Sequence, residues 1–442
     1  MKKNRFIAVL VTAALLLGLT ACNADPSKDT MTSADGSETA SDSVATESES
    51  NKSASGNKED LVCIIDVADE SFNTDIMNMI REKFGDKYNL IIKTWAGTDE
   101  IQTIKTASIA GEQVDLCMYW PNSMPDFLES DLALPLDEYM TDEWKSRFSE
   151  GALEIGTYGN SLYNLPYSTV YPMVIVNKSI ADEAGIELRG DGKWTWDEFL
   201  VFCSQVSDNT EAFGSVIPNG WAPWLTRNAY MQIWDTDEEL NAFCNGDISF
   251  LSDEIKEASD LVVHSFNENC FYPGGEASLA LETDEAYAAL ASGKVASLFT
   301  VNSMVLSVLV DTGLDDYVIM DWPSMGTNPT DPVLGGSNGY FIPSCAKNVE
   351  GAVEVLDFLT GPECAAVRAQ AGCVSTVIVN DVMNVDTELM SQISRCSDQI
   401  HSEITALSSE LTTYLELMPA NYYHYGEEAL QELEDMRLEA IE

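Results

Sequence analysis

The chain has 442 residues, 45% of them hydrophobic, which is enough to build two domains with separate cores. It carries 23 Lys and Arg residues against 73 Asp and Glu residues, a formal net charge of -50. A field of that sign repels phosphate backbones and anionic membrane surfaces, so the composition argues against a nucleic-acid partner. The acidic residues are spread along the chain, and we expect a solvated surface that can also attract a cationic ligand.

The first 22 residues have the order of a secretory signal: basic residues, an apolar stretch from Phe6 to Leu19, then small residues. The apolar stretch is too short for a stable membrane span. Its ending, Leu19-Thr20-Ala21-Cys22, resembles the bacterial lipobox, which implies cleavage before Cys22 and lipid attachment to its sulfur. The alternative is an ordinary signal peptide that contains a cysteine. The lipid reading predicts a protein anchored on the extracellular face of the bacterial cytoplasmic membrane.

Residues 23–60 contain nine serines and no aromatic residue. Such a tract cannot offset its ordering entropy by burial, so it is predicted to be a disordered tether. As a flexible coil it would reach about 35 Å.

Nine cysteines follow Cys22, an odd number without a C-x-x-C pair. This is a poor disulfide framework and a poor zinc site, and no metal or cofactor is expected. Most of the cysteines stand among apolar neighbours, which predicts small buried side chains.

From Leu61 the pattern alternates between strands and amphipathic helices, which predicts parallel sheets with covered faces. Strands are expected at 61–68, 89–95 and 114–120, and helices at 72–88 and 101–110.

After Lys178 the chain becomes mostly helical, and Thr195 with Glu198 predicts a capping box at the start of one helix. The tail from Asp386 to Met418 places apolar residues three or four apart. That spacing predicts a long helix packed on its own domain, with a coiled-coil seam as the alternative. Further helices are expected at 179–186, 195–207, 253–267 and 283–292, and strands at 294–301, 316–323 and 339–343.

Four segments share a pattern with one protein family. The most specific is "YGNSLYNLPYSTVYPMVIVNKSIADEAGI", followed by "KWTWDEF". The others are "VDLCMYWPNSMPDFLESDLALPLDEYM", "AALASGKVASLFTVNS" and "DWPSMG" with "PVLGGSNGYFIPSCAKNVEGAVEVLDFLTGPE". In this order they resemble the extracellular solute-binding proteins of ABC importers, in their sugar-binding branch (family 1 type). The resemblance covers Leu61 to about Val377.

The resemblance implies a two-lobed, periplasmic-binding-protein-like type II α/β fold, with a mostly parallel sheet flanked by helices in each lobe and three hinge crossings. It places lobe 1 at 61–168 plus 297–336, and lobe 2 at 169–296 plus 337–442. The later crossings are expected near 296–302 and 335–339. Pro166 and Pro172 would bracket the first, since proline removes a backbone donor and stops strand pairing.

A sugar offers apolar C–H faces and hydroxyl edges, so its site needs flat rings and paired polar side chains. Such residues stand after predicted strands and in turns, where ligands of open α/β sheets bind. Tyr167 and Tyr171 are candidates because they lie where the crossing strand is expected to be exposed. The predicted ligand-binding residues are Asp69, Glu70, Trp95, Tyr119, Trp120, Asn122, Tyr167, Tyr171, Trp221, Trp224, Asn302, Trp322 and Asn338.

The resemblance implies a monomeric, non-enzymatic receptor that captures a carbohydrate and delivers it to ABC permease subunits. One alternative is a polyamine or other cationic solute, held by Asp69, Glu70 and tyrosines. Another is a secreted hydrolase, because "GGSNG" satisfies G-x-S-x-G around Ser337. A nucleophile elbow needs a helix after the serine, whereas "YFIP" follows here. A glycosidase with two catalytic carboxylates is a further alternative, because 73 acidic residues allow many such pairs.

Overall fold

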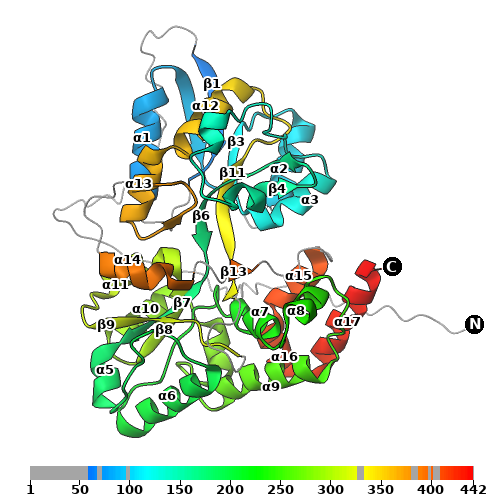
Figure 1. Ribbon diagram of the computed structural model, residues 1–442. Coiled ribbons are helices and arrows are strands. Elements are labelled where there is room, and N and C mark those ends of the chain that lie inside the picture. Colours follow the sequence, from blue (N-terminus) through cyan, green and yellow to red (C-terminus); the bar gives the residue numbers. More distant parts are fainter. Residues whose placement is uncertain are drawn as a thin grey trace, which may run out of the picture. The chain divides into compact units, whose positions relative to one another are not determined.

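The protein is represented by a computed structural model that describes residues 58–66, 72–95, 100–325, 333–379, 387–396, 400–401 and 409–441. Figure 1 shows that the helices gather around two separate sheets. Each sheet has its own apolar clusters on its faces, so the described residues form two lobes of α/β structure. Among the described residues, no helix combines the length and the apolarity that a membrane span needs.

The sheet of the first lobe has the strand order β12-β6-β11-β3-β1-β2. β1, β2 and β3 are parallel, and β11 pairs antiparallel with both β3 and β6. Side chains of β1 alternate between faces, so that Leu61 and Cys63 join one apolar cluster and Ile64 the other. The strands are β1 (Glu59–Ile64), β2 (Tyr88–Lys93), β3 (Leu116–Tyr119), β6 (Leu165–Val170), β11 (Gly336–Phe341) and β12 (Val374–Ser375).

Helices cover both faces of this sheet. In α1 the buried side chains Ile76, Met77, Ile80 and Phe84 fall on one stripe of the helix, as the sequence predicts. The helices of this lobe are α1 (Asn73–Phe84), α2 (Glu100–Ala110), α3 (Met124–Glu129), α4 (Asp142–Lys145), α12 (Val349–Leu359) and α13 (Pro362–Gln370). A small hairpin joins β4 (Thr157–Tyr158) to β5 (Ser161–Leu162).

The sheet of the second lobe has the order β8-β7-β9, with β7 (Pro172–Asn177), β8 (Ser297–Val301) and β9 (Tyr317–Asp321). Both partners run antiparallel to β7, whereas a mostly parallel sheet was predicted. Its side chains alternate as well: Val174 and Val176 face one cluster, Met173 and Ile175 the other.

The predicted capping box is confirmed at α6 (Trp196–Asn209), where Thr195 and Glu198 exchange hydrogen bonds with each other's backbone. The other helices of the second lobe are α5 (Lys178–Glu183), α7 (Pro223–Gln232), α8 (Asp237–Cys244), α9 (Asp253–Asn267), α10 (Thr283–Ala291), α11 (Val305–Thr312), α14 (Thr387–Ile393), α15 (Ser409–Glu416), α16 (Met418–Tyr425) and α17 (Glu427–Ile441).

Strand pairing corrects the predicted lobe boundaries. Residues 297–321 supply β8 and β9 of the second sheet, although 297–336 was assigned to lobe 1. Residues 336–370 supply β11, α12 and α13 of the first lobe, although 337–442 was assigned to lobe 2. No crossing lies near 296–302, because β8 pairs with β7 along its length. The chain instead passes between the sheets after β6, returns at β11, and leaves again between β12 and α14.

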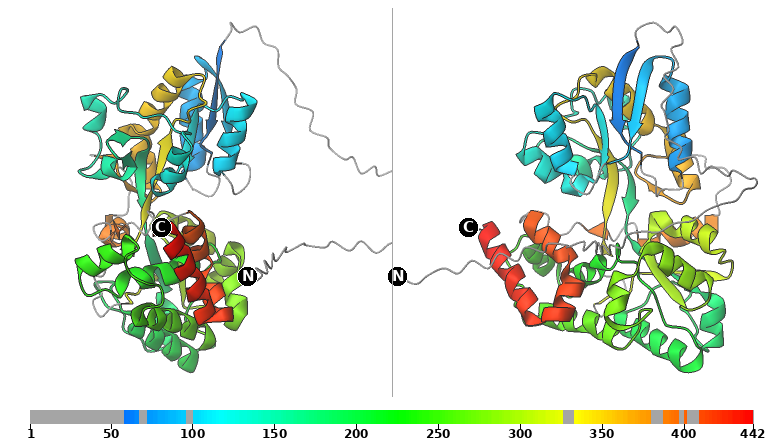
Figure 2. Two further views of the ribbon diagram at one scale, coloured as in Figure 1. Left: turned by 90° about the vertical axis from the view of Figure 1, so that its right-hand side faces the viewer. Right: turned by 180° about the vertical axis from the view of Figure 1, so that it is seen from behind.

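The tail is not one long helix. α14 and α15 are separate, and β13 (Ile400–His401) lies between them and pairs with β10 (Val333–Leu334). α15, α16 and α17 lie side by side in both views of Figure 2. They place Leu411, Leu415, Met418, Leu430 and Leu433 in the core of the second lobe. The prediction that residues 386–418 pack on their own domain holds for α14 and α15, whose apolar side chains lie in the clusters of the second lobe, although the predicted single helix is wrong.

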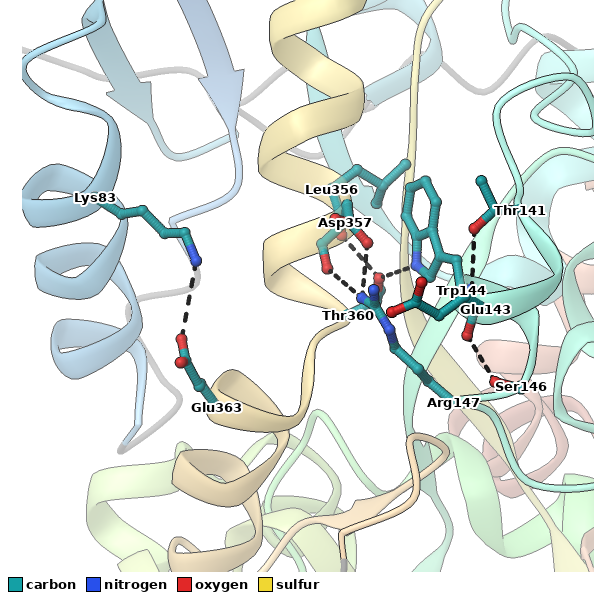
Figure 3. A network of polar contacts seen from close by, with 10 residues as sticks. All are labelled: Lys83, Thr141, Glu143, Trp144, Ser146, Arg147, Leu356, Asp357, Thr360 and Glu363. Atoms are coloured by element: carbon teal, nitrogen blue, oxygen red, sulfur yellow. Dashed lines mark hydrogen bonds and ion pairs between the residues drawn. The ribbon is translucent and has the colours of Figure 1, made fainter.

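In the first lobe, a buried polar contact joins α4 to the end of α12 (Figure 3). Trp144 Nε1 donates to Thr360 Oγ1 at 2.8 Å, and the Thr360 hydroxyl donates to Leu356 O at 2.8 Å. Beside it, Arg147 forms an ion pair with Asp357 at 2.7 Å. Thr360 is fully buried, so no water can replace its oxygen as an acceptor for the indole.

Thr360→Val is therefore expected to lower the free energy of unfolding by about 1–3 kcal/mol, because it keeps the side-chain volume but leaves a buried indole N–H without its acceptor. Equilibrium unfolding of the whole chain in urea measures this change. Ser146→Ala, which removes an exposed hydroxyl from the same network, is the control and should change stability by less than about 0.5 kcal/mol. Equal stability of Thr360→Val and the control would contradict the role assigned to this contact.

Candidate functional site

Three aromatic residues meet where the parallel strands of the first sheet end. Trp95 follows β2, Tyr119 ends β3, and Trp120 comes next. Ring centroids are 6.2 Å apart for Trp95 and Tyr119, and 5.2 Å apart for Tyr119 and Trp120. Trp95 Nε1 donates to Met118 O at 3.0 Å, which fixes the indole against the end of β3. We call these three residues the first-lobe aromatic cluster.

Trp120 is the exposed member of this cluster. It keeps 46% of its surface exposed, whereas Tyr119 beneath it is buried against Phe127 and Phe341. Single exposed apolar side chains are common on soluble proteins, but a ring that rests on a packed support can serve as a platform for the apolar face of a ligand. The rings are tilted to one another, by 71° for Trp95 and Tyr119 and by 52° for Tyr119 and Trp120, so the cluster presents the single ring of Trp120 at the carboxyl edge of the sheet.

The turn that carries Trp120 is held by two side chains that the sequence analysis did not select. The Tyr158 hydroxyl donates to the carbonyl of Pro121, and Asn164 Nδ2 donates to Tyr119 O at 3.2 Å. Burial raises the pKa of Tyr158 to about 12, so the phenol stays protonated and remains a donor at neutral pH. Both residues stand in the segment "YGNSLYN", which has neither the strand nor the helix period.

The second lobe carries its own tryptophan pair at the start of α7. Trp221 and Trp224 are half-buried, and their rings meet at 86° with centroids 5.9 Å apart. The loop before them is fixed because Asn219 N donates to Leu281 O at 2.7 Å and Asn219 Nδ2 donates to Glu282 Oε1 at 3.0 Å. These two indoles are the second-lobe tryptophan pair.

Asn302 follows β8 in the chain, is fully buried, and packs its side chain against the segment where the chain crosses from β6 to β7. Its Oδ1 accepts from Tyr171 N at 3.0 Å, and its Nδ2 donates to Thr169 O at 3.0 Å. Its own backbone N donates to Tyr171 O at 2.9 Å. The amide thus replaces the strand partners that the chain loses between β6 and β7, and it acts as a clamp on the crossing.

The expectation that Tyr167 and Tyr171 are exposed is wrong. Tyr167 keeps 1% of its surface, stacks on Tyr340 and lies 4.2 Å from the Arg368 guanidinium. Tyr171 is fully buried, and its hydroxyl donates to Ile393 O. The strand between the prolines stays covered because other strands and α14 pack on it. Both rings therefore contribute to the two cores and offer no face to a ligand in this structure.

Trp322, Asn338 and Ser337 are buried as well. Trp322 packs on Phe299 with ring centroids 4.6 Å apart. Asn338 lies in β11 at a register shift, next to Gly339. A Cβ on Gly339 would stand 1.9 Å from Asn164 Oδ1, so this glycine makes room for the amide that supports Trp120. Ser337 lies within β11 and its hydroxyl donates to Ser168 O at 2.6 Å, which is not the strand-to-helix turn of a nucleophile elbow.

Asp69, Glu70 and Cys22 lie outside the described residues, as does the side chain of Asn122. Of the predicted ligand-binding residues, the structure brings Trp95, Tyr119 and Trp120 together in the first lobe. It brings Trp221 and Trp224 together in the second.

Comparison with known proteins gives a family match over most of the folded region. A family model described as bacterial extracellular solute-binding protein matches residues 76–366. A protein of Brucella abortus (strain 2308), whose name describes it as a binding protein, is 25% identical over 261 residues. That alignment covers 59% of this chain and 61% of the Brucella protein, so the chain matches about three fifths of the relative's length.

Solved structures share the fold at low sequence identity. A structure from work on xylan utilization by Caldanaerobius polysaccharolyticus has a TM-score of 0.71 at 18% identity, covering 85% of this chain and 99% of that one. The GacH receptor of Streptomyces glaucescens, solved unliganded and in complex with acarbose, has a TM-score of 0.71 at 15% identity, covering 87% and 99%. These likenesses confirm the predicted fold class.

Replacing Asn302 by Ala is expected to lower the free energy of unfolding by about 3 kcal/mol, because the buried Tyr171 N–H and Thr169 carbonyl lose their partner together. Equilibrium unfolding in urea measures the change. Asn209→Ala removes an exposed amide that bonds the Gln205 carbonyl, and it should stay within about 0.5 kcal/mol of wild type. The clamp would be refuted if both variants were equally stable.

Proposed function

Since the chain belongs to the family of bacterial extracellular solute-binding proteins, we propose that it captures a carbohydrate between its two lobes and delivers it to an ABC permease. The ligand class proposed is an oligosaccharide. Support comes from the solved structures of the same fold, one from work on xylan utilization and one in complex with acarbose. The ligands named in these descriptions belong to the other proteins. An exposed aromatic side chain on this chain supports a carbohydrate ligand independently.

The observation that carries the proposal is the exposed Trp120 on its aromatic support. Stacking one ring face on a sugar contributes roughly 1–3 kcal/mol by area, and each net hydrogen bond adds about 1 kcal/mol. Trp120 with the second-lobe tryptophan pair therefore supplies enough apolar contact, with a few hydrogen bonds, for about micromolar affinity. One aromatic group on each lobe also means that closure of the lobes would bring both to a bound ligand.

The proposal assigns membrane attachment to the amino-terminal residues. The tether was predicted at residues 23–60, but Glu59 and Asp60 belong to β1, and the part before residue 58 lies outside the described residues. Lipid attachment at Cys22 and the segment between Cys22 and β1 would hold the receptor on the outer face of the cytoplasmic membrane, close to its permease. The receptor acts as a monomer in this proposal, because each chain has both lobes.

Trp120→Ala and Trp224→Ala are each expected to weaken binding of xylo- or malto-oligosaccharides by about 10-fold or more, since each removes a stacking surface of roughly 1–3 kcal/mol. Isothermal titration calorimetry measures the affinity. Trp234→Phe is the control, because this half-buried indole bonds the Tyr230 carbonyl on the far part of α7 and should leave the affinity unchanged. Equal affinities of wild type and the two alanine variants would remove this site assignment.

A cationic ligand is the second candidate, favoured by the net charge of -50. The two ligand classes respond differently to salt. A neutral sugar should keep its affinity within about twofold between 50 and 500 mM NaCl, whereas a polyamine should lose about 10-fold or more as its ion pairs are screened. Titrations of xylo-oligosaccharides and spermidine at both salt concentrations separate the classes. Tight, salt-sensitive spermidine binding without sugar binding would replace the carbohydrate proposal.

The proposal includes no chemical conversion. Oligosaccharides incubated with the protein should be recovered unchanged by mass spectrometry, and steady release of shorter sugars would instead indicate a glycosidase.

A further inference from the structure

Two grooves lie on the surface of the first lobe where α1 packs against α12 and α13. The first groove, of about 490 Å³, lies at the carboxyl end of α1, and the second, of about 480 Å³, lies between α1 and the last turn of α13. Neither is lined by a residue of the first-lobe aromatic cluster or the second-lobe tryptophan pair. We call this surface the α1–α13 face and define it by Asp75, Glu82, Lys83, Glu143, Phe358 and Glu363.

The floor of the first groove is aromatic and already holds a cation. The rings of Phe84 and Phe358 meet edge to face, with centroids 5.7 Å apart. Lys83 Nζ lies 4.0 Å from the centroid of Phe358 and 4.0 Å from Glu363 Oε2, and Figure 3 shows Lys83 directed from α1 towards Glu363. A ring face beside a carboxylate attracts an ammonium or guanidinium group. Because half of the Lys83 side chain is exposed, its ammonium can leave this position without unpacking the core.

Two further carboxylates of the first groove are matched by cations of the chain itself. Lys87 pairs with Glu354 at 2.5 Å, and this hydrogen bond holds the pKa of the carboxyl below its ordinary value. Arg147 pairs with Asp357 at 2.7 Å. These two pairs fix the wall of the groove on the side of α12, and their charges cancel.

The other carboxylates leave the face negatively charged. Asp75, Glu82 and Glu143 are exposed and form no ion pair among the described residues. Glu363 has Lys83 as its ion-pair partner. In addition, α1 and α12 both end at the first groove, and the carboxyl end of a helix carries a partial negative charge. The face therefore presents four carboxylates and two helix ends to one half-exposed ammonium group.

We propose that the α1–α13 face docks a basic segment of a partner protein. One Arg or Lys side chain of that segment takes the place of Lys83 over Phe358 and beside Glu363, and the next ones meet Asp75 and Glu82. The 12 residues of α1 span about 18 Å, which is the length of five or six extended residues. Because the two grooves follow one another along α1, an extended segment contacts both, whereas a small solute fills one.

Docking is tested with the full chain and a fluorescently labelled peptide, Gly-Arg-Gly-Arg-Gly-Arg-Gly with blocked ends, by fluorescence anisotropy at low salt. Glu82→Gln combined with Glu363→Gln is expected to weaken binding of this peptide by about fivefold or more, because it removes one counter-charge from each groove. The matched control combines Glu112→Gln with Glu129→Gln, which removes two exposed carboxylates elsewhere in the first lobe. The control should bind the peptide within about twofold of wild type.

Lys83→Gln tests the exchange of cations over the ring. It is expected to strengthen peptide binding by about threefold or more, because the competing ammonium is removed from Phe358. Lys93→Gln makes the same change of charge at the end of β2 and should alter the affinity by less than about twofold. Phe358→Leu should weaken binding and remove the gain that Lys83→Gln gives in the wild-type background. Circular dichroism verifies that the Phe358→Leu protein is folded.

Equal peptide binding by the wild type, the Glu82→Gln/Glu363→Gln protein and the control would overturn docking at this face. So would weaker binding by Lys83→Gln. Spermidine that binds as tightly as the peptide and loses affinity in the same variants would replace the basic segment by a small polyamine. The peptide assay contains no sugar, so a failure of the carbohydrate proposal would leave its result unchanged.

Discussion

The architecture depends on how the chain leaves one sheet and enters the next at Tyr171. A strand that stops pairing leaves backbone donors and acceptors without partners, and burying such groups is costly. Here the side chain of Asn302 takes the place of a neighbouring strand, since it bonds the backbone on both sides of the break. β7 then begins at Pro172, which has no backbone N–H and so cannot donate a hydrogen bond that would extend the first sheet. The amide and the proline together allow two sheets with separate cores to share one continuous segment.

This arrangement also explains why aromatic residues near the crossing differ so much in exposure. Tyr171 is enclosed because α14 packs over it, and its hydroxyl donates a hydrogen bond to the Ile393 carbonyl at the end of that helix. Tyr167 is enclosed by Tyr340 and by Arg368, whose charge lies over the ring and whose guanidinium donates to the Leu359 carbonyl. Trp120 stands outside both cores because Pro121 turns the chain away immediately after β3. The exposed ring is therefore placed by a turn, and the buried rings by strands.

Sequence patterns located most of the elements but not their lobes. Hydrophobic periodicity identified β1, α1 and the capping box of α6, because these signals are local. The same patterns say nothing about which sheet a strand joins, so β8 and β11 were assigned to the wrong lobes. In the tail, spacing at three or four positions predicted one helix, whereas the structure has α14, β13 and α15 there. The spacing of apolar residues along the chain cannot show that a helix is interrupted when the interrupting strand, β13, pairs with a strand distant in sequence, β10.

The candidate site was predictable to a similar extent. Tryptophans in turn-rich segments, such as Trp120 and Trp224, were selected from sequence and stand on or near the surface. Trp322 and Asn302 were selected by the same reasoning and are buried, because a residue at a strand end can point into a core as readily as out of it. Tyr158 and Asn164 were missed because their role, holding the turn of Trp120, comes from contacts distant in sequence.

The central claim is that two lobes with separate cores, joined at a clamped crossing, close on a sugar. Small-angle X-ray scattering of the full chain with and without a saturating oligosaccharide tests this claim most directly. The radius of gyration of the wild-type protein is predicted to decrease when the sugar binds. It should stay unchanged for Trp120→Ala at a sugar concentration that saturates the wild type but lies below the dissociation constant of the variant. Binding at full strength without any change in the radius of gyration would contradict closure of the lobes.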